Sequence, residues 1–230
     1  MKSIIKYFVF ACFLYLTGCE DNNSLHQKYL DEGEIYYIGM LDSLEIFPGK
    51  ERVRFSWTIN ADPRIVGTNI SWDEGKESVT IPIVRKQSGN MRMDTIINVA
   101  EGIYVFTLAN VDREGAKSKG VEGSTVVIYG AKYAENLQTR LVNSMTLNGT
   151  TLTIRWNSSE SLQIQHTLVR YTDYTDANNP SSKTVTVSNE DSQTVIENVR
   201  AGDIFSVITT YLPNNGIDTI DTLPIEYIVQ

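Results

Sequence analysis

The chain has 230 residues, of which 41% are hydrophobic, and its 20 basic and 28 acidic side chains give a formal net charge of −8. This length suffices for two domains of ordinary size with packed cores. The acidic balance opposes nucleic acid phosphates, so no nucleic-acid partner is expected. Because Cys12 and Cys19 both lie near the start, the rest of the chain has no disulfide, thiolate nucleophile or cysteine metal site.

Residues 1–18 are predicted to be a signal peptide. Lys2 and Lys6 precede an apolar run that is roughly half as long as a membrane-spanning helix requires. The end of this segment, Leu-Thr-Gly-Cys at residues 16–19, resembles the lipobox of bacterial lipoproteins. The resemblance implies cleavage before Cys19, a diacylglycerol on the Cys19 thiol and an acylated amine. The membrane would then be a partner through this lipid anchor.

The next segment, residues 19–33, is predicted to be a flexible tether. It begins with the acidic and polar residues Glu20, Asp21 and Asn22, which have no apolar surface to bury. Acidic residues directly after the lipid-bearing cysteine also resemble the surface-export signal of gut Gram-negative glycan-utilisation lipoproteins. An ordinary solvated linker would explain the same residues.

From residue 34 onward, the pattern is typical of an all-β protein. Apolar and polar residues alternate over residues 52–59, 78–84, 151–156 and 183–187. Turn signals rich in glycine, proline and asparagine recur about every ten residues, which is typical of a sandwich or barrel. Residues 131–137 alone indicate a turn or two of helix.

The two halves of this region repeat each other. The pattern Asn-Val-x-x-Gly occurs at residues 98–102 and again at residues 198–202. A repeat at domain length indicates two copies of one fold. We therefore predict one domain over residues 34–130 and a second over residues 131–230.

The strand around Trp57 and the segment 97–106 resemble a fibronectin type III module. In that module, a tryptophan on the second strand packs under an aromatic residue on the sixth, and Trp57 and Tyr104 match those places. In the second half, Trp156 matches the tryptophan, whereas Ile204 replaces the tyrosine. The resemblance implies two tandem fibronectin type III/immunoglobulin-like β-sandwiches.

Three segments, residues 33–39, 43–49 and 129–133, resemble an uncharacterised lipoprotein family of gut Gram-negative anaerobes. That family looks like an accessory of glycan-utilisation systems. The resemblance implies a lipid-anchored, surface-exposed protein of the outer membrane. Its partner would be a glycan or another protein of an uptake complex.

No catalytic constellation is present in the sequence, and neither an enzyme nor a cofactor is expected. His26 and His166 each lack a second histidine at ligand spacing. The nucleophile elbow, the phosphate-binding glycine loop and the His-Glu-x-x-His motif are all missing. A glycosidase needs two carboxylates across a cleft, which small sandwiches rarely provide.

Aromatic residues are the first candidates for ligand binding, because sugar rings stack on them. Tyr174 is predicted to lie in a loop, whereas Trp72 is a candidate either for the ligand or for the core. The loop that begins at Asp173 and includes Asp176 concentrates oxygen atoms of the kind that bind calcium. It lacks the regular spacing of a calcium loop, so a polar hairpin is the competing interpretation, and no metal is predicted.

We therefore expect a non-enzymatic surface lipoprotein that acts as a glycan-binding or complex-assembly accessory of a polysaccharide-utilisation system. Two alternatives are an adhesion or structural surface protein that assembles through strand edges, and a glycan-active enzyme.

Overall fold

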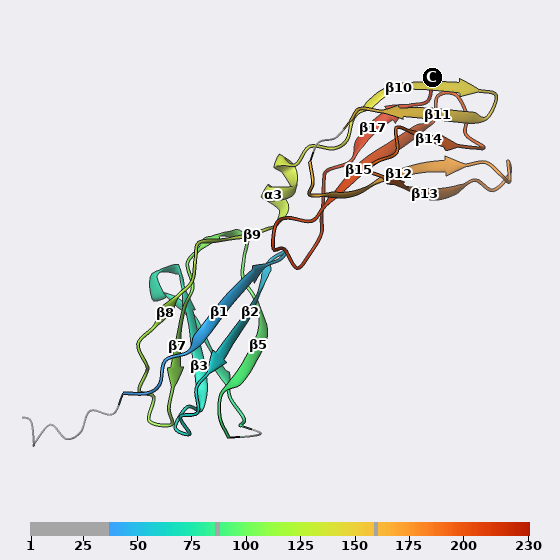
Figure 1. Ribbon diagram of the computed structural model, residues 1–230. Coiled ribbons are helices and arrows are strands. Elements are labelled where there is room, and N and C mark those ends of the chain that lie inside the picture. The colour runs from blue at the N-terminus through green and yellow to red at the C-terminus, as the bar shows by residue number, and fades with distance from the viewer. Residues whose placement is uncertain (1–36, 86–87, 159–160) are drawn as a thin grey trace, which may run out of the picture. The chain divides into compact units, whose positions relative to one another are not determined.

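The computed structural model describes residues 37–85, 88–158 and 161–230. These residues form two successive groups of strands, with the helix α3 (Ala131–Asn136) between them (Figure 1). The predicted signal peptide, Cys19 and the tether lie outside the described residues and stay predictions. Among the residues that the structure describes, no helix is both long and apolar enough to cross a membrane.

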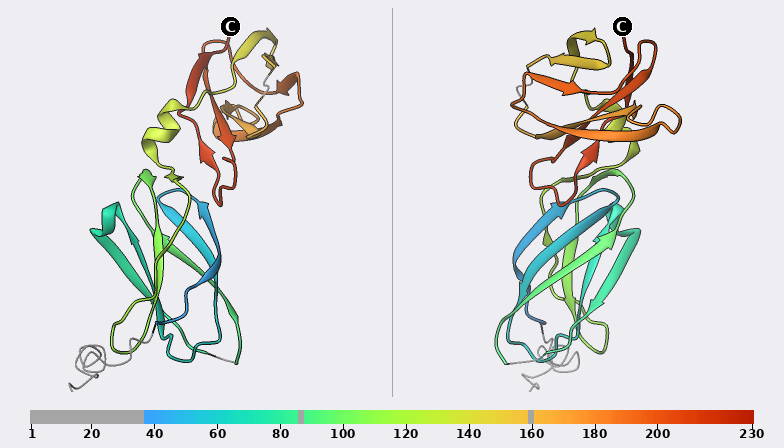
Figure 2. Two further views of the ribbon diagram at one scale, coloured as in Figure 1. Left: turned by 60° about the vertical axis from the view of Figure 1, so that its left-hand side comes forward. Right: turned by 90° about the vertical axis from the view of Figure 1, so that its right-hand side faces the viewer.

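The first group forms a β-sandwich, whose two sheets appear as separate layers in Figure 2. One sheet has the order β1-β2-β5, with the bounds β1 (Asp42–Pro48), β2 (Arg52–Ile59) and β5 (Met91–Asn98). The other has the order β4-β3-β7-β8, with the bounds β3 (Gly67–Trp72), β4 (Glu77–Pro82), β7 (Thr107–Val111) and β8 (Val121–Glu122). The short pair β6 (Gly102–Tyr104) and β9 (Val126–Ile128) is separate from both sheets, and the 3-10 turn η1 (Asp73–Gly75) joins β3 to β4.

The second group repeats this arrangement. Its three-stranded sheet has the order β10-β11-β14, with the bounds β10 (Val142–Asn148), β11 (Thr151–Trp156) and β14 (Gln193–Ile196). Its other sheet has the order β13-β12-β15-β16, with β17 also paired to β15. The bounds are β12 (Ile164–Asp173), β13 (Ser181–Ser188), β15 (Ile204–Tyr211), β16 (Ile220–Asp221) and β17 (Ile225–Ile228).

Each sandwich has its own hydrophobic core. In the first core, Val53, Phe55 and Trp57 of β2 are 0% exposed, because alternate side chains of a strand point to one face. The second core is built around Ile154 and Trp156 of β11 in the same way. Among the described residues, the buried members of the two cores fall between residues 38 and 229, and the two cores share none of them.

The protein is therefore all-β, as predicted, with the strand order of two fibronectin type III-like sandwiches. The second half differs in one detail from its predicted core. Ile204 does not take the inward aromatic position, because its side chain is 54% exposed. The next residue, Phe205, is 1% exposed and stacks on the ring of Tyr227 at 5.4 Å.

Candidate functional site

The candidate site is a groove of about 420 Å³ in the first sandwich. It lies between the connection from β3 to β4 and the connection from β5 to β6. The lining residues are Trp72, Asp73, Glu77, Asn98, Val99, Ala100 and Tyr104. Its volume falls within the roughly 300–1,000 Å³ typical of small-ligand sites.

Two aromatic side chains, Trp72 and Tyr104, contribute the apolar part of the lining. Both are half-buried, and the ring centroid of each lies 6.0 Å from that of Phe106, which is 0% exposed. The core therefore supports both rings, and the remainder of each side chain is available to the groove. The sequence left Trp72 between a core role and a ligand role. The structure packs its ring near Phe106 and exposes part of it to the groove, and the ligand role stays a prediction.

Glycine at position 102 is required by the conformation of Tyr104. A Cβ atom added to Gly102 would lie 2.9 Å from Cε2, Cζ and the hydroxyl oxygen of Tyr104, which is too close for ordinary contact. The tyrosine ring thus lies directly over the glycine, and its place in the groove depends on the missing side chain.

The rim formed by η1 has a strained backbone. Asp73 and Glu74 have φ angles of 50° and 57°, in the left-handed region that residues with a Cβ atom avoid, and Gly75 follows at 83°. Lys76 holds this turn through an ion pair between its Nζ and Asp73 Oδ2 at 3.5 Å. Such strain costs about 1–3 kcal/mol per residue and is concentrated at functional sites.

The opposite rim is held from both of its ends. The backbone N–H of Val99 donates to the carbonyl of Glu51 at 3.1 Å. The carboxylate of Glu101 accepts the backbone N–H groups of Lys132 and Tyr133 in the first turn of α3, at 3.0 and 2.6 Å. Ala100 lies between these two fixed points, so the groove is preorganised on this side.

The polar lining favours a ligand rich in hydroxyl groups. Asp73, Glu77 and Asn98 are all exposed. Carboxylates accept hydrogen bonds, and an amide both donates and accepts them. The two carboxylates would repel an anionic ligand, whereas a neutral ligand with hydroxyl donors and apolar C–H faces matches both the acids and the rings.

The corresponding place in the second sandwich is filled by the chain's own residues. The backbone N–H of Tyr174 donates to the carbonyl of Asn198 at 2.8 Å, which joins the two connections directly. The guanidinium of Arg200 lies 3.8 Å from the centroid of the Tyr174 ring, and the Tyr174 hydroxyl donates to Asp203 at 3.2 Å. One face of the ring is thus already covered.

The difference between the two places centres on a single position. Val99 and Val199 are both buried, and each donates its backbone N–H to the turn between the first two strands of its sandwich. The residue after this valine is Ala100 in the first sandwich and Arg200 in the second. The small side chain leaves the first groove open, whereas the guanidinium covers Tyr174 in the second.

The remaining predicted site residues lie beside Tyr174. Asp173 ends β12 and is 3% exposed, with an ion pair to Lys183 Nζ at 2.8 Å. Hydrogen bonding from Lys183, helped by the Thr175 side chain, lowers the pKa of Asp173 to about 2. Asp176 accepts the backbone N–H of Asn178 at 3.0 Å within a turn. Both carboxylates thus have internal partners, and their role as ligand-binding residues, like that of Tyr174, stays a prediction.

Metal-ligating side chains do not gather elsewhere in the described part of the chain. No group of three or more histidine, cysteine, aspartate and glutamate side chains is suitably placed within the described ranges. His166 is half-buried in β12, as its predicted strand position implies, and His26 lies outside the described residues.

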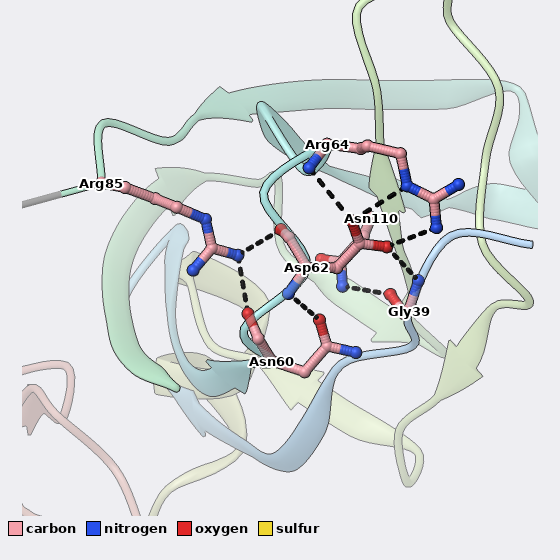
Figure 3. A network of polar contacts seen from close by, with 6 residues as sticks. All are labelled: Gly39, Asn60, Asp62, Arg64, Arg85 and Asn110. Atoms are coloured by element: carbon pink, nitrogen blue, oxygen red, sulfur yellow. Dashed lines mark hydrogen bonds and ion pairs between the residues drawn. The ribbon is translucent and has the colours of Figure 1, made fainter. Parts of the chain in front are cut away.

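A second hollow of the first sandwich, of about 390 Å³, lies beside Arg64 and Arg113. Arg64 donates from Nε and Nη2 to Asp62 at 3.0 and 2.8 Å, and Asp62 also accepts the backbone N–H groups of Arg64 and Gly39 (Figure 3). These bonds, above all those from the Arg64 side chain, hold the pKa of Asp62 well below its usual range. The network holds the segments around Gly39 and Asp62 together. The Asp62 carboxylate already accepts hydrogen bonds from protein donors on both of its oxygens.

Besides Tyr104, five lining residues of the Trp72 groove were not among the ligand-binding residues predicted from the sequence: Asp73, Glu77, Asn98, Val99 and Ala100. They lie on separate connections and strands that only the folded chain brings together. The turn signal at Glu74-Gly75 could have directed attention to the η1 rim. Tyr104 was assigned to the core, and its additional place in the groove lining has no signal in the sequence.

Comparisons with known proteins identify the family of the chain. No curated protein matches it. A two-domain fibronectin type III segment of chicken tenascin is 16% identical and covers 83% of this chain and 99% of that chain, with a TM-score of 0.34. The FN1–FN3 domains of chicken CNTN1 are 14% identical and cover 84% and 69%, with a TM-score of 0.33. Because both TM-scores are low, the fold assignment rests on the strand order of the chain itself. A family model matches residues 19–220, and the protein therefore belongs to DUF4998, a family described as a domain of unknown function.

Proposed function

We propose that this protein is a non-enzymatic surface lipoprotein of the outer membrane, and that the groove beside Trp72 and Tyr104 binds a glycan. The observation that carries this proposal is the groove itself, which combines two aromatic side chains, two carboxylates and an amide. A fibronectin type III-like fold supports a binding or structural role. The glycan-utilisation context comes from the family resemblance of the segments around residues 33–49 and 129–133.

The chemistry of a neutral sugar fits this lining. The C–H face of a pyranose ring is apolar and packs against an aromatic side chain such as Trp72. Its hydroxyl groups donate to the carboxylates of Asp73 and Glu77 and exchange hydrogen bonds with the amide of Asn98. Because both rims are held by internal contacts, little ordering of the protein would accompany binding, which favours affinity.

Shortening the aromatic side chain tests the proposal. Trp72→Ala is expected to weaken glycan binding at least about tenfold, which corresponds to about 1.4 kcal/mol. A glycan array probed with residues 20–230 would identify the ligand, and calorimetric titration would measure the affinity of each variant. Ala100→Arg should weaken binding to a similar extent, because it places a long side chain in the open groove without removing any core contact.

Variants of the second sandwich provide the matched controls. If the glycan binds in the groove of the first sandwich, Tyr174→Ala and Asp176→Asn leave affinity within about twofold of the wild type, since these residues lie outside that groove. If these variants weakened binding while Trp72→Ala and Ala100→Arg did not, the glycan site would belong to the second sandwich. Release of a cleaved product from the bound glycan would contradict the non-enzymatic role.

The proposed anchor has its own test. Cys19→Ala is expected to move the protein from the membrane fraction to the soluble fraction, because two or more acyl chains are needed for stable attachment. The measurement is fractionation of cells that express the full chain, together with the mass of the mature N-terminus. An unmodified thiol at position 19 in the native protein would exclude the lipid anchor.

A further inference from the structure

The outer edge of β13 is a long and regular strand edge. β13 pairs with β12 over eight consecutive residues, from Ser181↔Asp173 to Ser188↔His166, without any register shift. In the sheet order β13-β12-β15-β16, no described strand pairs with the other side of β13. This side therefore presents main-chain donors and acceptors to which another strand could bind.

Several other edges carry features that discourage such pairing. The first strand of each sandwich, β1 or β10, has a register shift. β4 ends at Pro82, and β14 has only four residues. β5 carries two charged side chains, those of Arg92 and Asp94, which form ion pairs with Glu45 and Arg54. β13 has neither a proline nor an acidic residue, and its one charge, on Lys183, is engaged with Asp173.

The contacts of Ser188 indicate which residues of β13 have outward-facing main-chain groups. Its N–H donates to Asp191 Oδ2 at 3.0 Å, and its carbonyl accepts from the N–H of Asp191 at 3.2 Å, so neither group bonds to β12. Hydrogen-bonded and non-hydrogen-bonded pairs alternate along an antiparallel ladder. The groups that face away from β12 further along the strand are therefore those of Thr186, Thr184 and Ser182.

We propose that β13 binds β13 of a second copy of this chain, as an antiparallel pair centred on Thr184. In this register, Thr184 faces Thr184 of the partner subunit, and Ser182 faces Thr186 of the partner subunit. Every such pair joins two residues with outward main-chain groups, and hydroxyl side chains lie opposite hydroxyl side chains, a favourable cross-strand pairing. Lys183 faces Val185 of the partner subunit, so no like charges oppose each other.

This self-complementary pattern is the reason to assign the edge to a second copy. A two-fold axis through Thr184 uses the same three residues on both chains and closes after two subunits. One strand edge buries less surface than a standard stable interface, so the dimer is expected to dissociate in the range of about 10 µM to 1 mM. The proposal is independent of glycan binding, because the Trp72 groove lies in the other sandwich.

Two lysine variants of equal charge test the register. Thr184→Lys places two lysines opposite each other across the axis, whereas Thr186→Lys places its lysine opposite Ser182 of the partner subunit. Thr184→Pro removes the outward N–H and leaves the ladder with β12 intact, since proline is tolerated at an edge when its nitrogen faces solvent. Sedimentation equilibrium of residues 20–230, which retain both cores, measures association from about 10 µM to about 1 mM.

The expected result is a weak wild-type dimer whose dissociation constant rises at least about tenfold in Thr184→Lys and Thr184→Pro and changes little in Thr186→Lys. Circular dichroism confirms that each variant is folded. A wild type that stays monomeric over the whole range would overturn the proposal. Equal dissociation constants for the two lysine variants would also overturn it, because the effect of the added charge would then not depend on its distance from the proposed two-fold axis.

Discussion

Replacing Trp57 with alanine is expected to destabilise the first sandwich by about 3–5 kcal/mol and to leave the second sandwich folded. Trp57 is 0% exposed and lies at the centre of the first core. Its indole Nε1 donates to Thr68 Oγ1 at 3.1 Å, and the Thr68 hydroxyl donates to Asn110 Oδ1 at 3.0 Å. The substitution therefore creates a large cavity and removes the donor at one end of a buried polar chain.

The effect should be confined to one thermal transition, because the two cores share no residue. A domain of this size has a total stability of about 5–15 kcal/mol. At about 4–8 °C per kcal/mol, the transition of the first sandwich should fall by between about 12 and 40 °C. Differential scanning calorimetry of residues 20–230 would resolve the lowered transition from the unchanged one.

The matched control is Trp156→Ala, which should lower the other transition. Trp156 is 5% exposed in the second core, and its indole donates to Thr194 Oγ1 at 2.8 Å. The pair of variants thus assigns each transition to one sandwich. If either substitution lowered both transitions together, the two sandwiches would unfold as one cooperative unit, against the separation of their cores.

Two strands with one buried face could be predicted from the sequence to the residue, whereas the predicted range 78–84 is displaced from β4 (Glu77–Pro82). The predicted ranges 52–59 and 151–156 coincide with β2 and β11, because in both strands alternate side chains enter a core. The range 183–187 is shorter than β13, which runs from Ser181 to Ser188. The extra residues of β13 are serines at an exposed edge, where burial imposes no alternation on the sequence.

The inward aromatic residue of the second sandwich could not be predicted from the repeat. Counting from the glycine of Asn-Val-x-x-Gly selects Ile204, but the structure buries Phe205 instead. A shift of one residue in a strand exchanges the two faces of the sheet. The connection before β15 accommodates a shift of one residue. Counting from the glycine of Asn-Val-x-x-Gly therefore does not reveal which residue of β15 faces the core.

The candidate groove was only partly predictable, for a different reason. Trp72 was singled out as an aromatic at the end of a strand, but Glu77, Asn98 and Tyr104 come from three other strands. The covering of Tyr174 by Arg200 joins residues 26 positions apart and depends on how two connections approach each other. Contacts between connections follow from the packing of the two sheets, which hydrophobic alternation alone does not specify.

Replacing Arg140 with methionine is expected to destabilise the second sandwich by about 3–5 kcal/mol. Arg140 is 6% exposed, and its guanidinium donates to three backbone carbonyls, those of Asn157 at 3.2 Å, Ser188 at 3.0 Å and Asp191 at 2.7 Å. Methionine fills much of the volume but removes the side-chain donor from the carbonyls of Asn157 and Asp191, and it leaves the Ser188 carbonyl with the backbone N–H of Asp191 as a donor. Scanning calorimetry should show a lower transition for the second sandwich alone.

The planar guanidinium is central to this effect. Burial lowers the pKa of Arg140, as expected for a cation that carbonyl oxygens solvate in place of water. Arg140→Lys should recover at most part of the lost stability, because one ammonium group cannot reproduce the fork of donors that reaches three separate carbonyls. Full recovery in Arg140→Lys would show that charge alone is required and would contradict the geometric explanation.

Arg85 provides the matched control in the first sandwich. It donates to the carbonyls of Asn60 and Asp62 at 2.6 and 2.7 Å (Figure 3) and to the carbonyl of Gly89 at 3.1 Å. Arg85 thus ties the end of β2 to the turn before β5, as Arg140 ties the end of β11 to the turn before β14. Arg85 is only half-buried, so water can replace part of what Arg85→Met removes, and the loss should be smaller. Two arginines from different segments thus make the same kind of link. If Arg85→Met lowered the free energy of unfolding of its sandwich as much as Arg140→Met does, or more, burial would not determine the strength of this link.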